Sequence, residues 1–172
     1  MSTDMNQTFE KIYELESDAI FRFCLIRVSD REQALDITQE VFLRLWQSLQ
    51  KGEDIKNSRA FLFTITHRLI IDWYRKKKSF SLEGLMSQDE GNEHDVVDEK
   101  TSGDQILSGA EGRYLVEKMN ELHPSHRDPV YLRYVEDLSP PEIGEIFGIS
   151  ANAASVRINR GLEELKQKYL SR

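Results

Sequence analysis

Residues 151–160 carry a set of side chains suited to reading nucleic acid. Small polar and basic groups recur there at helical spacing, so they share one face of a helix: Asn152, Ser155, Asn159 and Arg160. Amide, hydroxyl and guanidinium groups are the ones that reach base edges and phosphates. The pattern therefore indicates a DNA-reading helix.

A second such stretch combines positive charge with flat aromatic rings. Trp73 and Tyr74 stand directly before the basic run 75–78, and Arg68 lies upstream of them. Unpaired bases stack on such rings while cations follow the phosphates, at about 1–3 kcal/mol per stacked base. An alternative is a structural helix whose final cations complement its dipole. From the residues alone, both interpretations stay open.

The element that positions the first stretch is a predicted helix-turn-helix over residues 139–165. Ser139 and Glu142 form a capping box with Pro140 in the first turn, and Gly148 ends this helix where a positive φ is expected. Ser150 caps the second helix. The tight turn and the basic face favour a DNA reader over an ordinary helical hairpin.

The second stretch ends the third of three or four helices that we expect in the N-terminal part. The first carries an apolar stripe from Phe9 to Ile26, the second covers about 31–49, and the third covers about 58–78. The expected buried side of the second helix is Ala34, Leu35, Val41, Phe42, Leu45 and Leu49. No strand-like alternation occurs, so the sequence predicts an all-α fold.

Charge divides the chain, whose formal net charge is −7. Residues 56–78 are strongly basic, whereas residues 79–111 are strongly acidic and rich in Ser and Gly. We therefore expect two small helical domains, 1–78 and 112–172, joined by an acidic flexible linker at 79–111. A solvated linker is the default interpretation, and its charge leaves open a position in a basic groove of a partner.

Other functional classes find little support. Cys24 lies in an apolar patch and is expected to be a buried thiol in a reducing, cytoplasmic compartment. No membrane span or secretory signal is expected. His123, His126 and Asp128 have passable metal-ligand spacing, but prolines interrupt them and no further ligand supports them. We expect no metal, no cofactor and no enzymatic activity, because no nucleophile–base pair or phosphate-binding loop stands out.

Three motifs together resemble the extracytoplasmic-function sigma factors, bacterial RNA polymerase subunits that keep only sigma domains 2 and 4. The segment 36–46, DITQEVFLRLW, looks like the family's docking segment for the clamp helices of the polymerase β′ subunit. Residues 60–75 are similar to the helix that melts and reads the minus-ten element. Residues 132–134 and 142–161 look like the domain-four reader of the minus-thirty-five element.

The resemblance implies a role for each set of matched residues. Core-polymerase docking is implied for Asp36, Gln39, Glu40, Phe42, Arg44 and Trp46. Minus-ten contacts are implied for Lys56, Asn57, Arg59, Arg68, Trp73, Tyr74, Arg75, Lys76 and Lys77. Minus-thirty-five contacts are implied for Arg133, Asn152, Ser155, Val156, Asn159 and Arg160. The implied partners are core RNA polymerase (β′ clamp helices and β flap), promoter DNA and an anti-sigma factor that can hold the protein at the inner membrane face.

The chain departs from the family pattern at three places. Arg68 replaces the Asn that contacts a flipped minus-ten base, and Arg can bond guanine or hold phosphate. Gly144 replaces an Ala, which is expected to cost helix stability. Residues 153–155 are Ala-Ala-Ser where many members have Thr-Val-Lys, so one cation is missing from the reader.

Two rival functions remain beside a sigma factor that directs transcription initiation. A stand-alone helix-turn-helix regulator, with an N-terminal sensing or dimerising bundle, predicts specific duplex binding without polymerase. A protein-interaction adaptor predicts no dependence on DNA. The docking pattern of residues 36–46 argues against both, because neither function needs it.

Overall fold

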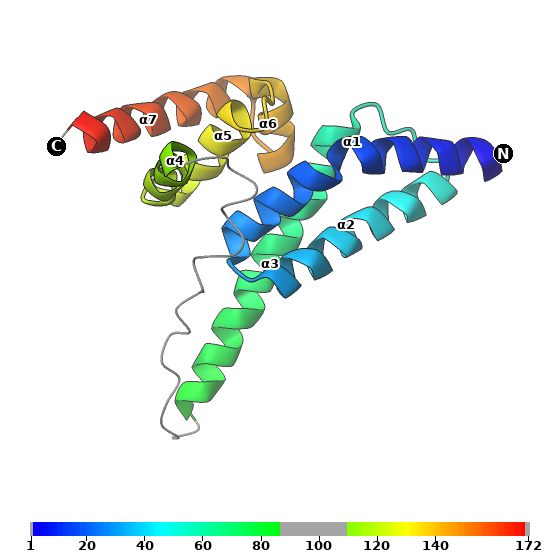
Figure 1. Cartoon of the computed structure of the whole chain (residues 1–172), viewed down its shortest axis with the longest axis horizontal. Helices are drawn as coiled ribbons and strands as arrows, with labels where there is room; N and C mark the ends of the chain where they lie inside the picture. The colour runs from blue at the N-terminus through cyan, green and yellow to red at the C-terminus, as the bar shows by residue number, and fades with distance from the viewer. Residues whose placement is uncertain (1, 87–109, 171–172) are drawn as a thin grey trace. The chain divides into compact units, whose positions relative to one another are not determined.

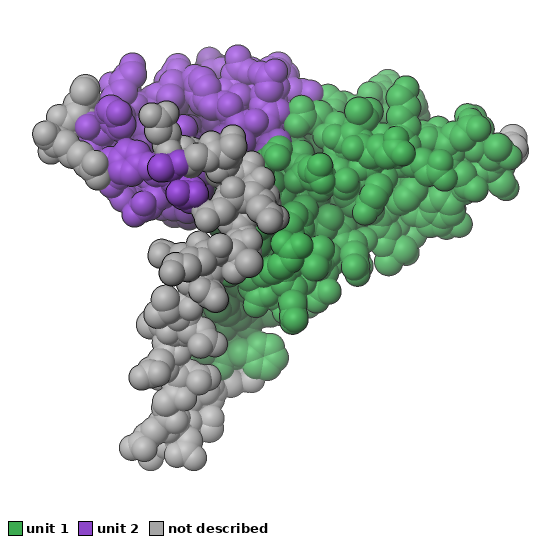
Figure 2. All heavy atoms as spheres, viewed as in Figure 1, with its two compact units in different colours: residues 1–102 green, residues 103–172 purple. Residues whose placement is uncertain are grey.

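The computed structural model describes residues 2–86 and 110–170, and these form helices joined by short loops (Figure 1). The helices are α1 (Ser2–Val28), α2 (Arg31–Gln50), α3 (Ser58–Met86), α4 (Ala110–Asn120), α5 (Pro124–Tyr134), α6 (Pro140–Phe147) and α7 (Ala151–Leu170). The predicted all-α class is confirmed for this part of the chain. The chain divides into two compact units, residues 1–102 and 103–172 (Figure 2). No helix among the described residues is long and apolar enough to span a bilayer.

Unit 1 is a helical hairpin of α1 and α2 with α3 packed against both. The hairpin turns at Ser29, which has φ 55°, and Asp30 then caps α2 by accepting a hydrogen bond from the Gln33 backbone N–H at 3.1 Å. Phe23 of α1 meets Phe63 of α3 edge to face, with 5.7 Å between ring centroids. The side chains that fill this core are fully buried: Ile20, Phe23, Val41, Leu45, Leu62 and Phe63.

The third helix is longer than expected, because α3 does not end at Lys78 but continues through Met86, into the range predicted as linker. No Gly or Pro occurs between Lys78 and Gly84, so nothing in this segment breaks the helix. Phe80 and Leu82 are therefore exposed helical side chains rather than parts of a linker. The rest of the predicted linker up to residue 109 lies outside the described residues.

Unit 2 contains the helix-turn-helix that the sequence predicts. The capping box is present, since Ser139 Oγ accepts from the Glu142 N–H at 3.4 Å and Glu142 Oε2 accepts from the Ser139 N–H at 2.7 Å. Gly148 has φ 66°, and Ser150 Oγ accepts from the Ala153 N–H at 3.0 Å. The hydrophobic core of unit 2 contains the buried side chains of Tyr131, Leu132, Leu138, Ile143, Ala154 and Ile158.

Gly144 is required by the turn and is not a weakened helix position. A Cβ at this residue would lie 2.6 Å from the carbonyl oxygen of Ile149 and 3.2 Å from the Ser150 carbonyl group. These are backbone atoms, and Ile149 N–H already bonds to the Gly144 oxygen at 2.9 Å. The turn residues therefore press directly on α6, and the expectation that Gly144 merely costs helix stability is corrected.

We expect Gly144→Ala to destabilise unit 2 by about 1–3 kcal/mol, because overpacking against backbone outweighs the better helix propensity of Ala. Helix propensity alone predicts the opposite sign, a gain of about 1 kcal/mol. Urea denaturation followed by circular dichroism measures the difference. The exposed neighbour Glu145→Ala is the control and should change stability little. A Gly144→Ala protein as stable as the wild type would contradict the close packing.

Candidate nucleic-acid interface

The first half of α7 presents the predicted DNA-reading side chains on one face. Asn152, Asn159 and Arg160 are exposed, Val156 is 39% exposed, and Ser155 is half-buried. Ala154 and Ile158 lie on the other side of the helix and are buried in the core. Because the buried stripe fixes the rotation of α7, two amides and a guanidinium point away from the unit, where a major groove can receive them.

Arg133, the remaining predicted residue of this reader, supports the turn before α6. Its Nη1 donates to the Leu138 carbonyl at 3.3 Å and lies 3.6 Å from Asp137 Oδ1. Asp137 itself has φ 55°, a backbone conformation that a nearby hydrogen bond helps to hold. Arg133 is half-buried, so its structural contact lies at the edge of the reader and not on the face of α7.

The segment 68–77 of α3 carries the predicted cations of the other reader. Arg68, Arg75, Lys76 and Lys77 are all exposed on this helix. Arg75 lies 3.9 Å from Asp72, a separation that leaves only a weak surface ion pair. This segment of α3 is therefore a basic helical surface along which a phosphate backbone can run.

Both aromatic rings of this surface are held by hydrogen bonds to the α1–α2 hairpin. Trp73 Nε1 donates to Gln33 Oε1 at 3.2 Å, and the Tyr74 hydroxyl donates to the carbonyl oxygen of Arg27. The two rings meet edge to face at 5.0 Å, and Lys77 Nζ lies 4.9 Å from the Trp73 ring centroid. Trp73 is half-buried and Tyr74 is 43% exposed, so neither ring belongs to the core.

The three predicted minus-ten residues before and at the start of α3 have different positions. Lys56 is exposed. Asn57 caps α3, because its Oδ1 accepts from the Ala60 N–H at 3.0 Å. Arg59 forms an ion pair with Glu16 of α1, with 2.9 Å between Arg59 Nε and Glu16 Oε2. Asn57 and Arg59 are half-buried, and their contacts hold the start of α3 in place.

Among the residues predicted to form the docking face of α2, only Phe42 is buried. Asp36, Gln39 and Arg44 are exposed, and Arg44 Nε donates to Glu40 Oε1 at 2.8 Å. Phe42 is only 4% exposed. It packs under Phe9 and Tyr13 of α1, with 4.8 Å between the Tyr13 and Phe42 ring centroids, and supports the face from below. Trp46 is half-buried against Phe9 at 5.3 Å.

Two leucines of this face were missed from sequence. Leu35 is 40% exposed, which corrects its expected burial, and Leu43 is 49% exposed. At about 100° of rotation per residue, Leu43 lies opposite the buried side chains of Val41 and Leu45. A helical-wheel count from the core stripe could have found Leu43, but not Leu35, because Leu35 lies about 20° from the buried Phe42 on the wheel. Leu35, Gln39 and Leu43 follow one another at spacing i, i+4, i+8 and form a strip with Gln39 between the two leucines.

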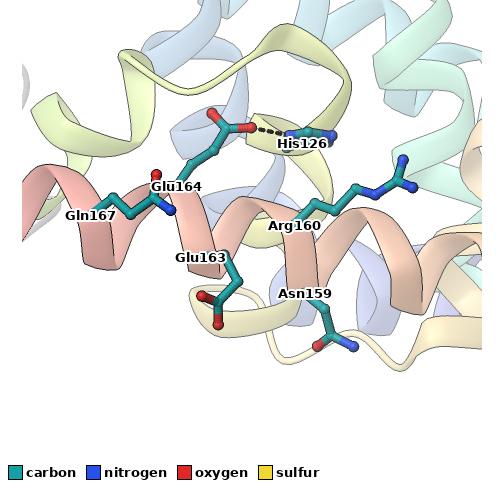
Figure 3. Close-up of a pocket in the computed structure, with 6 residues that line it drawn as sticks. All are labelled: His126, Asn159, Arg160, Glu163, Glu164 and Gln167. Atoms are coloured by element: carbon teal, nitrogen blue, oxygen red, sulfur yellow. Dashed lines mark hydrogen bonds and ion pairs between the residues drawn. The ribbon is translucent and has the colours of Figure 1, made fainter.

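The histidines of the HxxHxD sequence take structural contacts. His123 Nδ1 accepts from the Ser125 N–H at 3.2 Å and so caps α5. His126 Nδ1 contacts Glu164 Oε1 of α7, which Figure 3 shows beside Arg160 and Gln167 around a shallow pocket. No cluster of three or more acidic, His or Cys side chains that could hold a metal occurs among the described residues.

These contacts change the acidity of Glu164. Desolvation acts to raise the pKa of its carboxyl, but the His123 backbone N–H at 3.2 Å, the His126 ring and the charge of both histidines lower it below its usual 4.5. The carboxylate therefore ties the start of α5 to α7 while it remains ionised.

The only cysteine, Cys24, is buried in the core of unit 1. Burial raises the pKa of its thiol to about 12, against a smaller lowering by a hydrogen bond with Thr38. The thiol therefore stays protonated at physiological pH and packs as a small hydrophobic group, as expected from the sequence.

Comparison with protein families matches both units. Sigma-70 region 2 matches residues 12–80, and Sigma-70 region 4 matches residues 112–165. The ECF RNA polymerase sigma factor SigW of Bacillus subtilis is 29% identical over 164 residues, which cover 93% of this chain and 88% of SigW. The ECF RNA polymerase sigma factor SigL of Mycobacterium tuberculosis is 24% identical over 156 residues, which cover 90% of this chain and 85% of SigL.

Solved structures show the same fold. The sigma factor RpoE of Bartonella quintana, in complex with the anti-sigma factor NepR, has a TM-score of 0.71 at 20% identity, covering 96% of this chain and 99% of RpoE. CnrH in complex with the cytosolic domain of CnrY has a TM-score of 0.67 at 18% identity, covering 95% of this chain and 88% of CnrH.

We expect Arg59→Ala to lower the free energy of unfolding of unit 1 by about 1–3 kcal/mol, because it leaves Glu16 poorly compensated; this is below the cost at a fully buried pair. Glu16 has a side-chain exposure of 11% and Arg59 of 32%. Chemical denaturation measures the change. The matched control is Arg68→Ala on the same helix, an exposed residue that should leave stability unchanged. Equal stabilities of the two variants would contradict a structural role for Arg59.

The lowered pKa of Glu164 predicts a pH dependence of the stability of unit 2. A depressed carboxyl pKa stabilises the fold above its unfolded value, 4.5, and the contribution disappears as the pH falls through the folded-state pKa. Glu164→Gln should therefore have a lower thermal midpoint than the wild type at about pH 5.5, and the two midpoints should converge in acid. A constant difference across this range would show that the charge of Glu164 contributes nothing.

Proposed function

The chain belongs to the extracytoplasmic-function sigma factors, and from this we propose how its surfaces divide the work of promoter recognition. As a sigma factor it binds core RNA polymerase and promoter DNA and directs promoter-specific transcription initiation. Catalysis belongs to the polymerase, since sigma factors are non-enzymatic initiation factors. We therefore assign residues of this chain to each contact. We also propose that the protein is cytoplasmic, because the polymerase and the chromosome are in the cytoplasm.

Core polymerase docks on the exposed face of α2. Asp36, Gln39 and Arg44 supply polar contacts, and Leu35 and Leu43 supply apolar area on either side of Gln39. Covering this apolar area adds affinity, and the polar residues beside it add specificity. The charged β′ clamp helices then align on Asp36 and Arg44, and Phe42 acts from beneath by holding α1 against α2.

Duplex DNA is read by α7. Asn152 and Asn159 reach base edges, Arg160 contacts a phosphate or a guanine, and Val156 contacts a thymine methyl group. The missing cation at Ser155 shifts part of the readout to groove shape. Unit 2 makes few phosphate contacts by itself, so firm binding depends on the polymerase holding it together with unit 1.

The observation that carries the proposal is the combination of exposed cations with a fixed aromatic pair on α3. The phosphates of the non-template strand are contacted by the exposed cations Lys56, Arg68, Arg75, Lys76 and Lys77. Trp73 stacks on an unpaired base of the same strand. Arg68, where the family has Asn, favours guanine or a phosphate at the flipped position. Melting is driven by capture of the opened strand, since extruding a base costs only a few kcal/mol.

An anti-sigma factor inhibits this chain by covering the same face of α2. Leu35 and Leu43 are exposed on this face, so their apolar area is available to a partner. A partner that covers them excludes polymerase by direct competition. The domain division that we propose follows the predicted ranges 1–78 and 112–172, with the first domain lengthened by the continuation of α3 to Met86.

Run-off transcription with purified bacterial core polymerase on host genomic fragments tests the function. We expect discrete new starts that require this protein, with related sequences near minus ten and minus thirty-five. A specific footprint by the protein alone, without polymerase-dependent starts, would instead support a stand-alone regulator. If a protein with a normal circular dichroism spectrum gives neither new starts nor a footprint, the result would support the protein-interaction adaptor.

The double variant Gln39→Ala, Arg44→Glu should weaken binding to core polymerase at least about tenfold, because it removes one contact and reverses another at the centre of the face. The fold should be intact, since both residues are exposed and the Arg44–Glu40 pair is a surface pair. Fluorescence anisotropy with labelled protein measures the affinity. Lys11→Glu, an exposed charge reversal on α1, is the control. Unchanged affinity of the double variant would overturn the assignment of the face.

A further inference from the structure

Trp73 is held in one orientation by a side chain of another helix. Its indole N–H donates to Gln33 Oε1 at 3.2 Å across the contact between α2 and α3. An indole N–H can only donate, so the Gln33 atom that faces it has to be the carbonyl oxygen. Gln33 itself lies in the first turn of α2, where Asp30 Oδ1 accepts from its backbone N–H at 3.1 Å. A capped helix start therefore anchors the acceptor.

The neighbouring ring is held at the same corner of the hairpin. The Tyr74 hydroxyl donates to the carbonyl of Arg27, which lies in the last turn of α1. Tyr74 then meets Trp73 edge to face at 5.0 Å. The Trp73 ring is thus restrained at its N–H by Gln33 and at its side by Tyr74.

An exposed lysine side chain lies over the Trp73 ring. Lys77 Nζ lies 4.9 Å from the ring centroid, and Lys77 is solvent-exposed. A cation–π contact at an exposed site is worth about 0.5–1 kcal/mol, less than the stacking of a base on the ring. A base can therefore replace the ammonium group, which becomes available for a phosphate of the same strand.

We propose that Gln33 is a positioning residue for strand capture: it fixes Trp73 so that the ring face under Lys77 is presented to an unpaired base. The inference rests on the proposed minus-ten role of Trp73. Without the Gln33 acceptor the indole N–H loses its partner and the ring samples other rotamers. Stacking then has to restrict those rotamers, which reduces the advantage gained from opening the duplex.

Two substitutions at residue 33 separate the acceptor from the bulk of the side chain. Gln33→Leu keeps the size and the helix propensity but removes the acceptor, whereas Gln33→Glu keeps an oxygen acceptor in the same place. Each variant, loaded on core polymerase, is tested on a duplex promoter and on the same promoter with a pre-melted minus-ten region. The rate of open-complex formation is followed by a fluorescent base analogue in the non-template strand.

We expect Gln33→Leu to slow opening of the duplex promoter about five- to tenfold, the effect of losing one hydrogen bond that preorganises the site. Gln33→Glu should stay within about twofold of the wild type, because its carboxylate accepts the same bond. On the pre-melted promoter Gln33→Leu should recover most of the wild-type rate. A Trp46→Phe background leaves Trp73 as the only tryptophan of the chain. In this background, acrylamide quenching of Trp73 fluorescence should rise for Gln33→Leu but not for Gln33→Glu.

The outcomes distinguish failure of this inference from failure of the proposed function. If the wild type opens neither promoter, the proposed function is wrong and this inference with it. If the wild type is active and Gln33→Leu opens the duplex at the wild-type rate, Gln33 has no positioning role. If Gln33→Leu is equally slow on both promoters, or has lost stability by circular dichroism, its role is structural and the inference is overturned.

Discussion

The hydrophobic contact between α3 and the α1–α2 hairpin is the constraint on which the functional surfaces of unit 1 depend. Phe23, Leu62 and Phe63 are almost fully buried there, and the Glu16–Arg59 ion pair closes one end of the contact. A helix can present a basic surface in a fixed direction only if its other side is held by such a core. The proposed docking face of α2 and the proposed nucleic-acid surface of α3 therefore depend on the same core, although we propose different partners for them.

Unit 2 uses a different constraint, a turn with almost no spare volume. Gly144 lets the backbone of residues 149–150 lie against α6, and Gly148 allows the chain to reverse with a positive φ. Two capped helix starts, at Ser139 and Ser150, then set where α6 and α7 begin. The orientation of α7 therefore follows from the backbone geometry of the turn and from helix capping, together with a small core. A unit of this size buries too little apolar surface to be held by burial alone.

Local rules were sufficient for most of the fold. Capping residues, apolar periodicity and the glycine of the turn are encoded within a few positions of each other, so the helices of the helix-turn-helix could be predicted from sequence. The end of α3 could not, because composition suggested a linker while no helix breaker was present before Gly84. The sequence pattern was also insufficient to separate Leu35, which is exposed, from Ala34 and Ile37, which are buried.

Contacts between distant residues were the part of the candidate site that sequence could not supply. Gln33 and Trp73 are separated by 40 positions, and Arg27 and Tyr74 by 47. Nothing in their local spacing indicates that they meet. The same holds for Arg59, for which the family resemblance implied a DNA contact and which forms an ion pair with Glu16 in this structure. Residue type identified the chemistry of these groups, whereas tertiary packing decided which of them are already engaged.

The buried thiol of Cys24 has a practical consequence. With a pKa of about 12 and no exposure to solvent, it should be inert to maleimides and mild oxidants while the fold persists. Dyes can then be attached to cysteines introduced at exposed sites on the two units, such as positions 11 and 166, without first removing the native one. The separation of the units, free and on polymerase, becomes accessible to single-molecule energy transfer in an otherwise unaltered protein.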